Sequence, residues 1–334
     1  MIDFRYHLVS IIAVFLALAV GLVLGATALS GPALSTLQRL EKTVSRENST
    51  LLREKQAFAN QISADQTFAA AAAPRLLPGV LAGEKVVLVQ ASTASPSVAA
   101  GLTTALKQAG ATVTGTVTLN SPFLDTSGAN EVQLKQLAYT LARETRVPLP
   151  AELSSSVGAQ QAAAKVLAAS LLTSSDSGLS AADSQTILTG LSRGNFISVS
   201  SGSIQPASLA ILVTPGGPPP QSGSQVLVAT AVALRNASVS SGTVMVGAVQ
   251  SIGTPSPISA ENGLSPQQVS TVDNADTQIG QITTVWALRE LLDGKPPAKY
   301  GIQPAAVPTP APTPSVTPTL TPTPGTSSHP GGHT

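Results

Sequence analysis

The chain has 334 residues, of which 43% are hydrophobic and 10% are charged, and its formal net charge at pH 7 is +1. This charge gives no electrostatic reason to bind nucleic acid, so we expect no nucleic-acid partner. The sequence contains no cysteine, which excludes disulfides and thiolate metal sites.

An apolar segment at residues 8–29 carries no charged side chain. A helix of this length spans roughly 33 Å, close to the hydrocarbon core of a bilayer at about 30 Å. A cleaved secretory signal is the alternative, because Ala26, Thr27 and Ala28 resemble a cleavage site. Signal cores usually run about 7 to 15 apolar residues, so the length favours an uncleaved transmembrane helix.

Two kinds of sequence signal give opposite predictions for the orientation of this helix in the membrane. Arg5 precedes the segment, whereas Arg39, Lys42 and Arg46 follow it, which is the reverse of the usual positive-inside distribution. The lack of cysteine and the Thr-Pro-rich end of the chain instead favour an exterior location. We therefore predict a cytoplasmic tail at residues 1–7 and a single-pass protein of the cell membrane or envelope, with the bulk of the chain extracytoplasmic.

Small residues recur at every fourth position of the apolar segment, which places them on one face of a helix. Such a face lets a second backbone approach closely, so the pattern predicts a homodimer or higher oligomer in the bilayer. Ordinary membrane-helix composition is the alternative, because this spacing also occurs by chance. The predicted packing residues are Ala13, Ala17, Gly21 and Gly25.

Residues 35–68 are charged and helix-forming, with apolar residues seven apart, which predicts a parallel coiled coil. Glu47 and Glu54 occupy positions where a second apolar seam is expected. A single amphipathic helix packed on the following domain is therefore the alternative. The predicted seam consists of Leu37, Val44, Leu51 and Phe58.

The composition changes at 69–83, where alanine, proline and glycine predict a hinge. Beyond it, a strand at 86–90, a helix at 95–109 and a strand at 112–119 form a βαβ unit, which is typical of a parallel sheet. We predict one α/β domain over residues 84–301, Rossmann-like with a mostly parallel sheet. Further helices are expected at 130–145, 157–173, 181–193, 224–236 and 277–293, and further strands at 196–199, 209–214 and 243–249.

The end of the chain, at 302–334, repeats Thr-Pro and has almost no charge or large apolar side chain. Such a segment cannot bury a core, so we predict a disordered, polyproline-like tail.

Histidine is as scarce as cysteine: His7 lies at the membrane edge, and His329 and His333 lie in the tail. A domain without histidine cannot assemble a Ser-His triad or a histidine-ligated zinc site. No glycine-rich phosphate motif follows a strand, and Gly216 and Gly217 predict a plain turn. We therefore expect no enzyme and no tightly bound cofactor.

Asp273 and Asp276 are an acidic pair near an element boundary and have the chemistry of ligands for a hard cation. We favour a structural role, because they precede the helix predicted at 277–293, where carboxylates cap free amides. Met245 and Trp286 each lie in an apolar element and are expected in the core.

Two distant stretches share the pattern of one known family. The first runs HLVS at 7–10, AVFLALA at 13–19 and GLVLG at 21–25; the second runs STVD at 270–273 and continues through Asp276, Gly280, Ile282, Thr283, Val285, Ala287, Leu288, Leu291, Leu292, Gly294, Tyr300 and Gly301. With shorter matches at 83–89, 108–117 and 211–216, they resemble the actinobacterial copper transporter MctB family. The resemblance covers residues 1–301.

This resemblance implies a role in copper transport or efflux and copper homeostasis, with copper as the transported ion. Copper prefers sulfur or imidazole ligands, and the predicted domain contains Met245 and no histidine, so we assign no metal ligand. One uncharged helix cannot line a pore alone, so transport requires an oligomer or a partner channel. The alternative is a non-catalytic, membrane-anchored scaffold or regulator of an envelope partner such as a cell-wall hydrolase.

Overall fold

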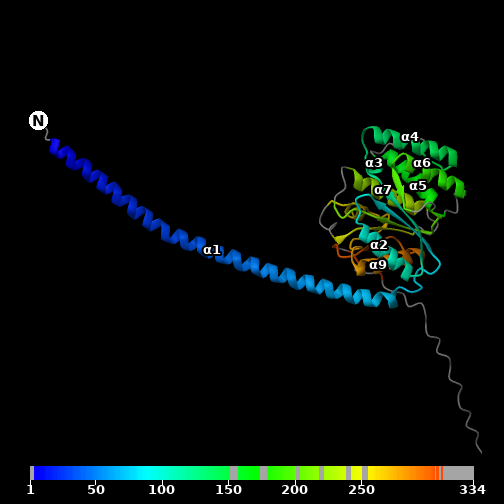
Figure 1. Cartoon of the computed structure of the whole chain (residues 1–334), viewed down its shortest axis with the longest axis horizontal. Helices are drawn as coiled ribbons and strands as arrows, with labels where there is room; N and C mark the ends of the chain where they lie inside the picture. The colour runs from blue at the N-terminus through cyan, green and yellow to red at the C-terminus, as the bar shows by residue number, and fades with distance from the viewer. Residues whose placement is uncertain are drawn as a thin grey trace, which may run out of the picture. The chain divides into compact units, whose positions relative to one another are not determined.

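A computed structural model of the chain describes residues 4–150, 157–173, 179–200, 204–217, 222–237, 242–249, 255–304, 306–307 and 310, with the backbone alone at 4–5 and 26–36. The chain divides into two compact units, Met1–Thr67 and Phe68–Thr334. Each unit is described by itself below (Figure 1). The predicted tail at 302–334 lies mostly outside the described residues.

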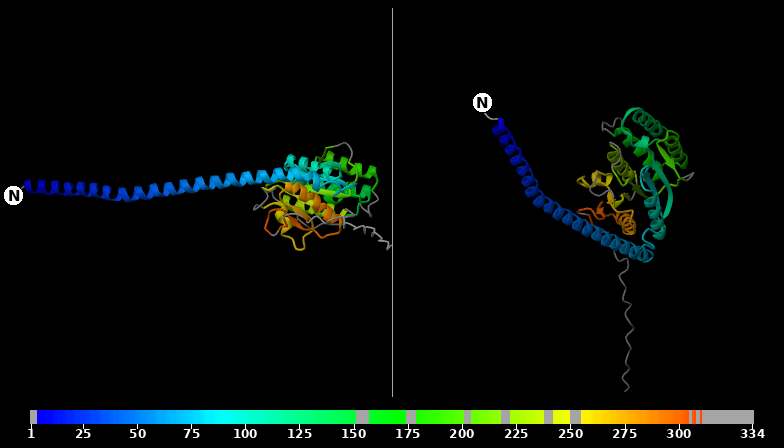
Figure 2. Two further views of the ribbon diagram at one scale, coloured as in Figure 1. Left: turned by 90° about the horizontal axis from the view of Figure 1, so that it is seen from below. Right: turned by 60° about the vertical axis from the view of Figure 1, so that its left-hand side comes forward.

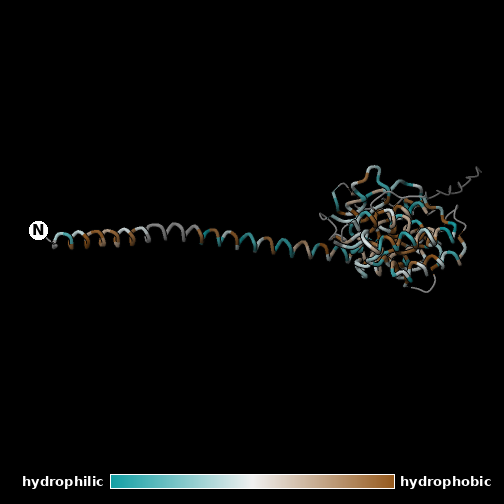
Figure 3. The backbone as a smooth tube through the Cα atoms, turned by 90° about the horizontal axis from the view of Figure 1, so that it is seen from above, coloured by the Kyte–Doolittle hydropathy of each residue, from teal (hydrophilic) through white to brown (hydrophobic). Residues whose placement is uncertain are grey.

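Helix α1 (Phe4–Leu76) accounts for the described part of the first unit and continues into the second. Its first turns are hydrophobic, and polar and apolar residues alternate further along (Figure 3). The predicted hinge is wrong over its first part, because the helix continues to Leu76 through alanines, the strongest helix formers. Ala73 and Leu77 are buried in the core of the second unit. The helix ends just before Pro78, whose ring opposes further helix.

The second unit is built on one seven-stranded sheet with the order β3-β2-β1-β4-β5-β6-β7. All neighbouring strands are parallel except β2 and β3, which are antiparallel. This confirms the predicted α/β domain with a mostly parallel sheet. The first six strands follow the order of doubly wound folds, in which the third strand is parallel instead. The strands are β1 (Lys85–Ala91), β2 (Thr112–Leu119), β3 (Ile197–Val199), β4 (Leu209–Val213), β5 (Thr243–Val246), β6 (Ser270–Val272) and β7 (Lys299–Tyr300).

Helices cover both faces of this sheet. Figures 1 and 2 show α2 and α9 packed together on one side and α4, α5, α6 and α7 gathered on the other. Every residue of β4 and β5 is buried, which explains their continuous apolar sequences. The helices are α2 (Pro96–Gln108), α3 (Ser121–Leu124), α4 (Gly128–Thr145), α5 (Gly158–Leu171), α6 (Ala181–Arg193), α7 (Gly223–Ala237), α8 (Pro257–Asn262) and α9 (Gln278–Leu292).

Local sequence signals explain where several elements begin. Helix α6 starts after a capping box, in which the Ser180 hydroxyl accepts from the Asp183 amide and the Asp183 carboxylate accepts in return. The helices and strands predicted beyond residue 84 are all present, with ends that differ by three residues or fewer. The short elements α3, α8, β6 and β7 were not predicted.

Candidate functional site

The part of α1 between Tyr6 and Gly25 is long and apolar enough to cross a membrane. Its 20 residues span about 30 Å, which matches the thickness of the bilayer core. None of this segment is buried by protein, so its apolar surface is available to lipid. The side chains of residues 26–29, the end of the predicted segment, lie outside the described part of the chain. The helix thus fits a single-pass membrane anchor.

The predicted packing face of this helix is open in the single chain. A Cβ atom added at Gly21 or Gly25 would meet no atom within 4 Å, and Ala13 and Ala17 are exposed. Leu37, Val44, Leu51 and Phe58 are also uncovered, with exposed fractions between 54% and 64%. Both surfaces remain predicted interfaces, because one chain by itself supplies no partner for them.

Asp273 does not cap α9, contrary to the prediction. It follows β6, is 1% exposed, and accepts hydrogen bonds from the amides of Ile302 (2.9 Å, to Oδ1) and Gln303 (2.8 Å, to Oδ2). Gly301 makes this approach possible, since a Cβ there would lie 1.9 Å from the Asp273 carboxylate. The carboxylate therefore fastens the chain after β7 to the end of β6.

Asp276 is also no cap: its carboxylate accepts a hydrogen bond from the Val249 amide at 3.0 Å. Thr277 is the N-cap of α9, because its hydroxyl accepts from the Gly280 amide at 3.0 Å. A Cβ at Gly280 would lie 1.9 Å from the Asn274 carbonyl oxygen, so this turn requires glycine. The acidic pair is thus divided between two structural tasks.

A second polar cluster near β7 had no signal in the sequence. The Tyr300 hydroxyl donates to the Glu290 carboxylate, which also pairs with the Lys295 ammonium at 2.5 Å. Burial raises the pKa of the Tyr300 phenol, and the hydrogen bond and negative charge of Glu290 raise it further. Tyr300 is therefore protonated at neutral pH and holds β7 against the end of α9.

Glu261 is a fully buried carboxylate in α8. Its Oε1 accepts from the amides of Gln268 and Val269, both at 2.7 Å. These two bonds fix the turn that leads into β6. Like Asp273, this acid accepts hydrogen bonds from two backbone amides.

Copper ligands are scarce in the described chain. Met245 is 0% exposed within β5, as predicted, and Trp286 is half-buried on α9. Among the described residues, no group of three or more His, Cys, Asp or Glu side chains is arranged to hold a metal ion. His329 and His333 lie outside these residues.

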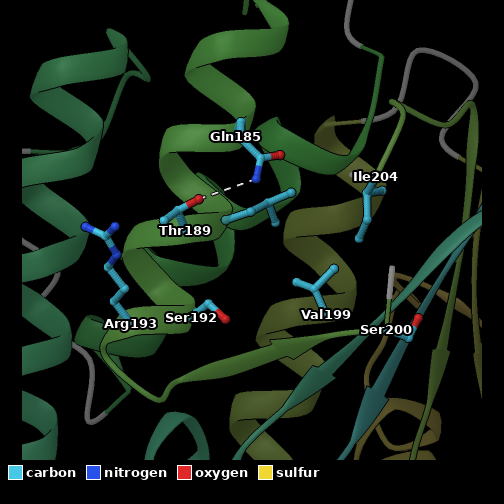
Figure 4. Close-up of a pocket in the computed structure, with 8 residues that line it drawn as sticks. Gln185, Thr189, Ser192, Arg193, Val199, Ser200 and Ile204 are labelled. Carbon is cyan, nitrogen blue, oxygen red and sulfur yellow. Dashed lines mark hydrogen bonds between the residues drawn. The ribbon is translucent and has the colours of Figure 1, made fainter. Parts of the chain in front are cut away.

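One cavity, of about 410 Å³, lies between α6 and the segment that contains β3 (Figure 4). The Gln185 side-chain amide donates to the Thr189 hydroxyl at 3.4 Å, and Arg193 is the only ionisable residue among the described residues of the lining. The described lining residues offer a polar binding surface, and among them no base lies beside a nucleophile as catalysis would require.

The features described above define a class of protein: one apolar helix suited to a membrane, joined to an α/β unit. Comparison with known families identifies the group within that class. A family model described as "Copper transport outer membrane protein, MctB" matches residues 1–310. The chain therefore belongs to the MctB family, which confirms the resemblance found in the sequence.

Curated relatives cover nearly the whole chain. It is 28% identical over 308 residues to the "Copper transporter MctB" of Mycobacterium tuberculosis (strain ATCC 25618 / H37Rv), which covers 90% of this chain and 96% of the relative. The protein of the same name from Mycobacterium leprae (strain TN) is 29% identical over 313 residues, with the same coverage. Both units are therefore shared with these relatives.

Proposed function

We propose that this protein limits intracellular copper as a membrane-anchored envelope protein that takes part in copper transport or efflux. The observation that carries this proposal is the family match over residues 1–310, which includes the apolar helix and the α/β unit. Residues 1–7 are cytoplasmic in this proposal, and the α/β unit lies outside the cytoplasm.

Copper is the transported ion in this proposal and has no tight site in the α/β unit. The support is chemical: the chain has no cysteine, and the sulfur of Met245 is buried alone in β5. A single helix also cannot form a pore, so the ion passes through an oligomer or a partner channel. The α/β unit acts without catalysis, as a surface for assembly.

The test is intracellular copper in a strain that lacks this gene, grown with added copper and compared with the same strain carrying the gene back. We expect copper to accumulate in the deletion strain and to return to the starting level on complementation. Unchanged copper in the deletion strain would overturn the transport role and leave an anchored scaffold for an envelope partner.

A variant chain tests whether the tail imidazoles take part. We expect a chain with His329→Ala and His333→Ala to restore copper as fully as the original chain, because the proposed route needs no ligand there. If this variant is equally abundant in the membrane but does not restore intracellular copper to the starting level, copper must contact the tail directly.

A further inference from the structure

A groove of about 670 Å³ lies over α7, between α5 and α8. Its floor is a stripe of small apolar residues three or four positions apart on α7, which share one face of the helix. We call it the α7 groove and define it by the floor residues Val228, Ala229, Val232 and Ala233. Its volume falls within the range of small-molecule sites, about 300 to 1,000 Å³.

The α7 groove contains one charge. Lys165 of α5 is the only charged residue among the described residues of its lining, and its side chain is exposed. Among the described residues Lys165 forms no ion pair, since the ion pairs found there join Arg289 to Asp293 and Lys295 to Glu290. The other polar side chains among the described lining residues are neutral amides, so none of these residues repels an anion.

We propose that the α7 groove binds a long-chain carboxylic acid, with its alkyl chain on the α7 floor and its carboxylate at Lys165. Burying an alkyl chain against valine and alanine is favourable in proportion to the apolar area removed from water. One uncompensated ammonium matches one carboxylate in charge. The proposal is independent of the role in copper transport.

The experiment uses the full chain in phosphatidylcholine vesicles that contain a palmitic acid analogue with a photoreactive diazirine in its chain. After irradiation, mass spectrometry locates the labelled positions. We expect label on α7 as well as on the membrane segment Tyr6–Gly25, which serves as an internal standard. A photoreactive phosphatidylcholine with the same chain should label the membrane segment alone, which distinguishes a free acid from a bilayer lipid.

Variants then test each part of the groove. Lys165→Gln should lower labelling of α7 by about two- to fivefold, the scale of a partly exposed ion pair. Ala229→Trp should abolish it, because the indole would occupy the floor. Lys135→Gln, on the exposed side of α4, is the matched control and should leave labelling unchanged. Labelling of the membrane segment should stay constant in all three variants.

Three results would overturn the proposal: labelling of α7 no stronger than that of the exposed side of α4, equal labelling by the photoreactive phosphatidylcholine, or equal labelling of the Lys165→Gln variant. The first result would leave a helix of a partner protein as the occupant to test.

Discussion

Two buried carboxylates in the α/β unit accept hydrogen bonds from backbone amides. Asp273 and Glu261 each accept hydrogen bonds from two consecutive amides, and both acids are almost completely buried. A buried amide without a partner costs about 1 to 3 kcal/mol, so each acid holds a turn that would otherwise be costly. At the scale of single residues, these acids therefore determine how the chain enters β6 and how it leaves β7.

Asp273→Asn tests this role. The substitution turns one acceptor toward the Ile302 and Gln303 amides into a donor, so we expect the free energy of unfolding to fall by about 1 to 3 kcal/mol. Urea unfolding followed by the fluorescence of Trp286, the only tryptophan, measures the change. Glu144→Gln, on the exposed side of α4, is the control and should have little effect. An equal loss in both variants would contradict the role assigned to Asp273.

Tyr300 gives stability a dependence on pH. Its pKa is raised above the ordinary value of about 10, so the folded chain keeps a proton that the unfolded chain releases. This stabilisation is complete below pH about 10 and is lost as the pH rises from there toward the folded pKa. Above pH 10, the free energy of unfolding of the original chain should fall faster than that of the Tyr300→Phe variant. We expect the difference to be at most about 1.4 kcal/mol per pH unit.

Urea unfolding at a series of pH values from 8 to 11 would measure this difference. The matched control is Tyr139→Phe, which removes a hydroxyl bound to the Pro150 carbonyl. Its free energy of unfolding should depend on pH as that of the original chain does. Parallel curves for the original chain and Tyr300→Phe would show that the phenol is not held protonated by the fold.

Among the elements, α1 exposes the longest apolar surface in the described chain. Leu37, Val44, Leu51 and Phe58 remain uncovered at seven-residue intervals in the described chain. Apolar residues repeated every seven positions are the pattern of a coiled-coil seam. The element thus has the pattern expected of one strand of a homodimer.

Single cysteines test this pairing, because the chain has none of its own. We expect Val44→Cys to form a disulfide between copies in membranes under mild oxidation. Ser49→Cys, about 140° further round the helix, should not. Gly21→Ile combined with Gly25→Ile should lower the yield of the Val44→Cys dimer, because larger side chains separate the membrane helices. An unchanged yield would exclude that face as the interface.

Elements with a clear local signal were predictable, and four short elements without one were not. The apolar run of β4 and the capping box of α6 are local signals, and both elements are present as expected. β7 and α8, of two and six residues, are too short to show a period and have no continuous apolar run. The role of Asp273 was unreadable because its partners lie 29 and 30 residues further along the chain. The hinge prediction failed because alanine suits both a linker and a helix.

For the whole molecule, the family match extends across both units, so the family combines the apolar helix with the α/β unit in one chain. The proposed topology places residues 1–7 and the α/β unit on opposite sides of the membrane. We expect a membrane-impermeant maleimide to label Glu144→Cys in intact cells. Asp3→Cys should react only after permeabilisation. The reverse pattern would place the α/β unit in the cytoplasm and agree with the distribution of basic residues instead.

The Asp273 carboxylate also determines how the α/β unit responds to tension. Beyond β7, the Val307 backbone pairs with the Lys299 carbonyl and the Gly301 amide at 2.8 and 3.0 Å. A pull on the chain past Val307 would open this pairing one bond at a time and then load the carboxylate. Its two hydrogen bonds connect the chain after β7 to the end of β6, which has a strand on each side. Residues 302 and 303 are therefore attached to the end of β6, an inner strand of the sheet. Force applied beyond Val307 would load β6 before β7 separates from the sheet.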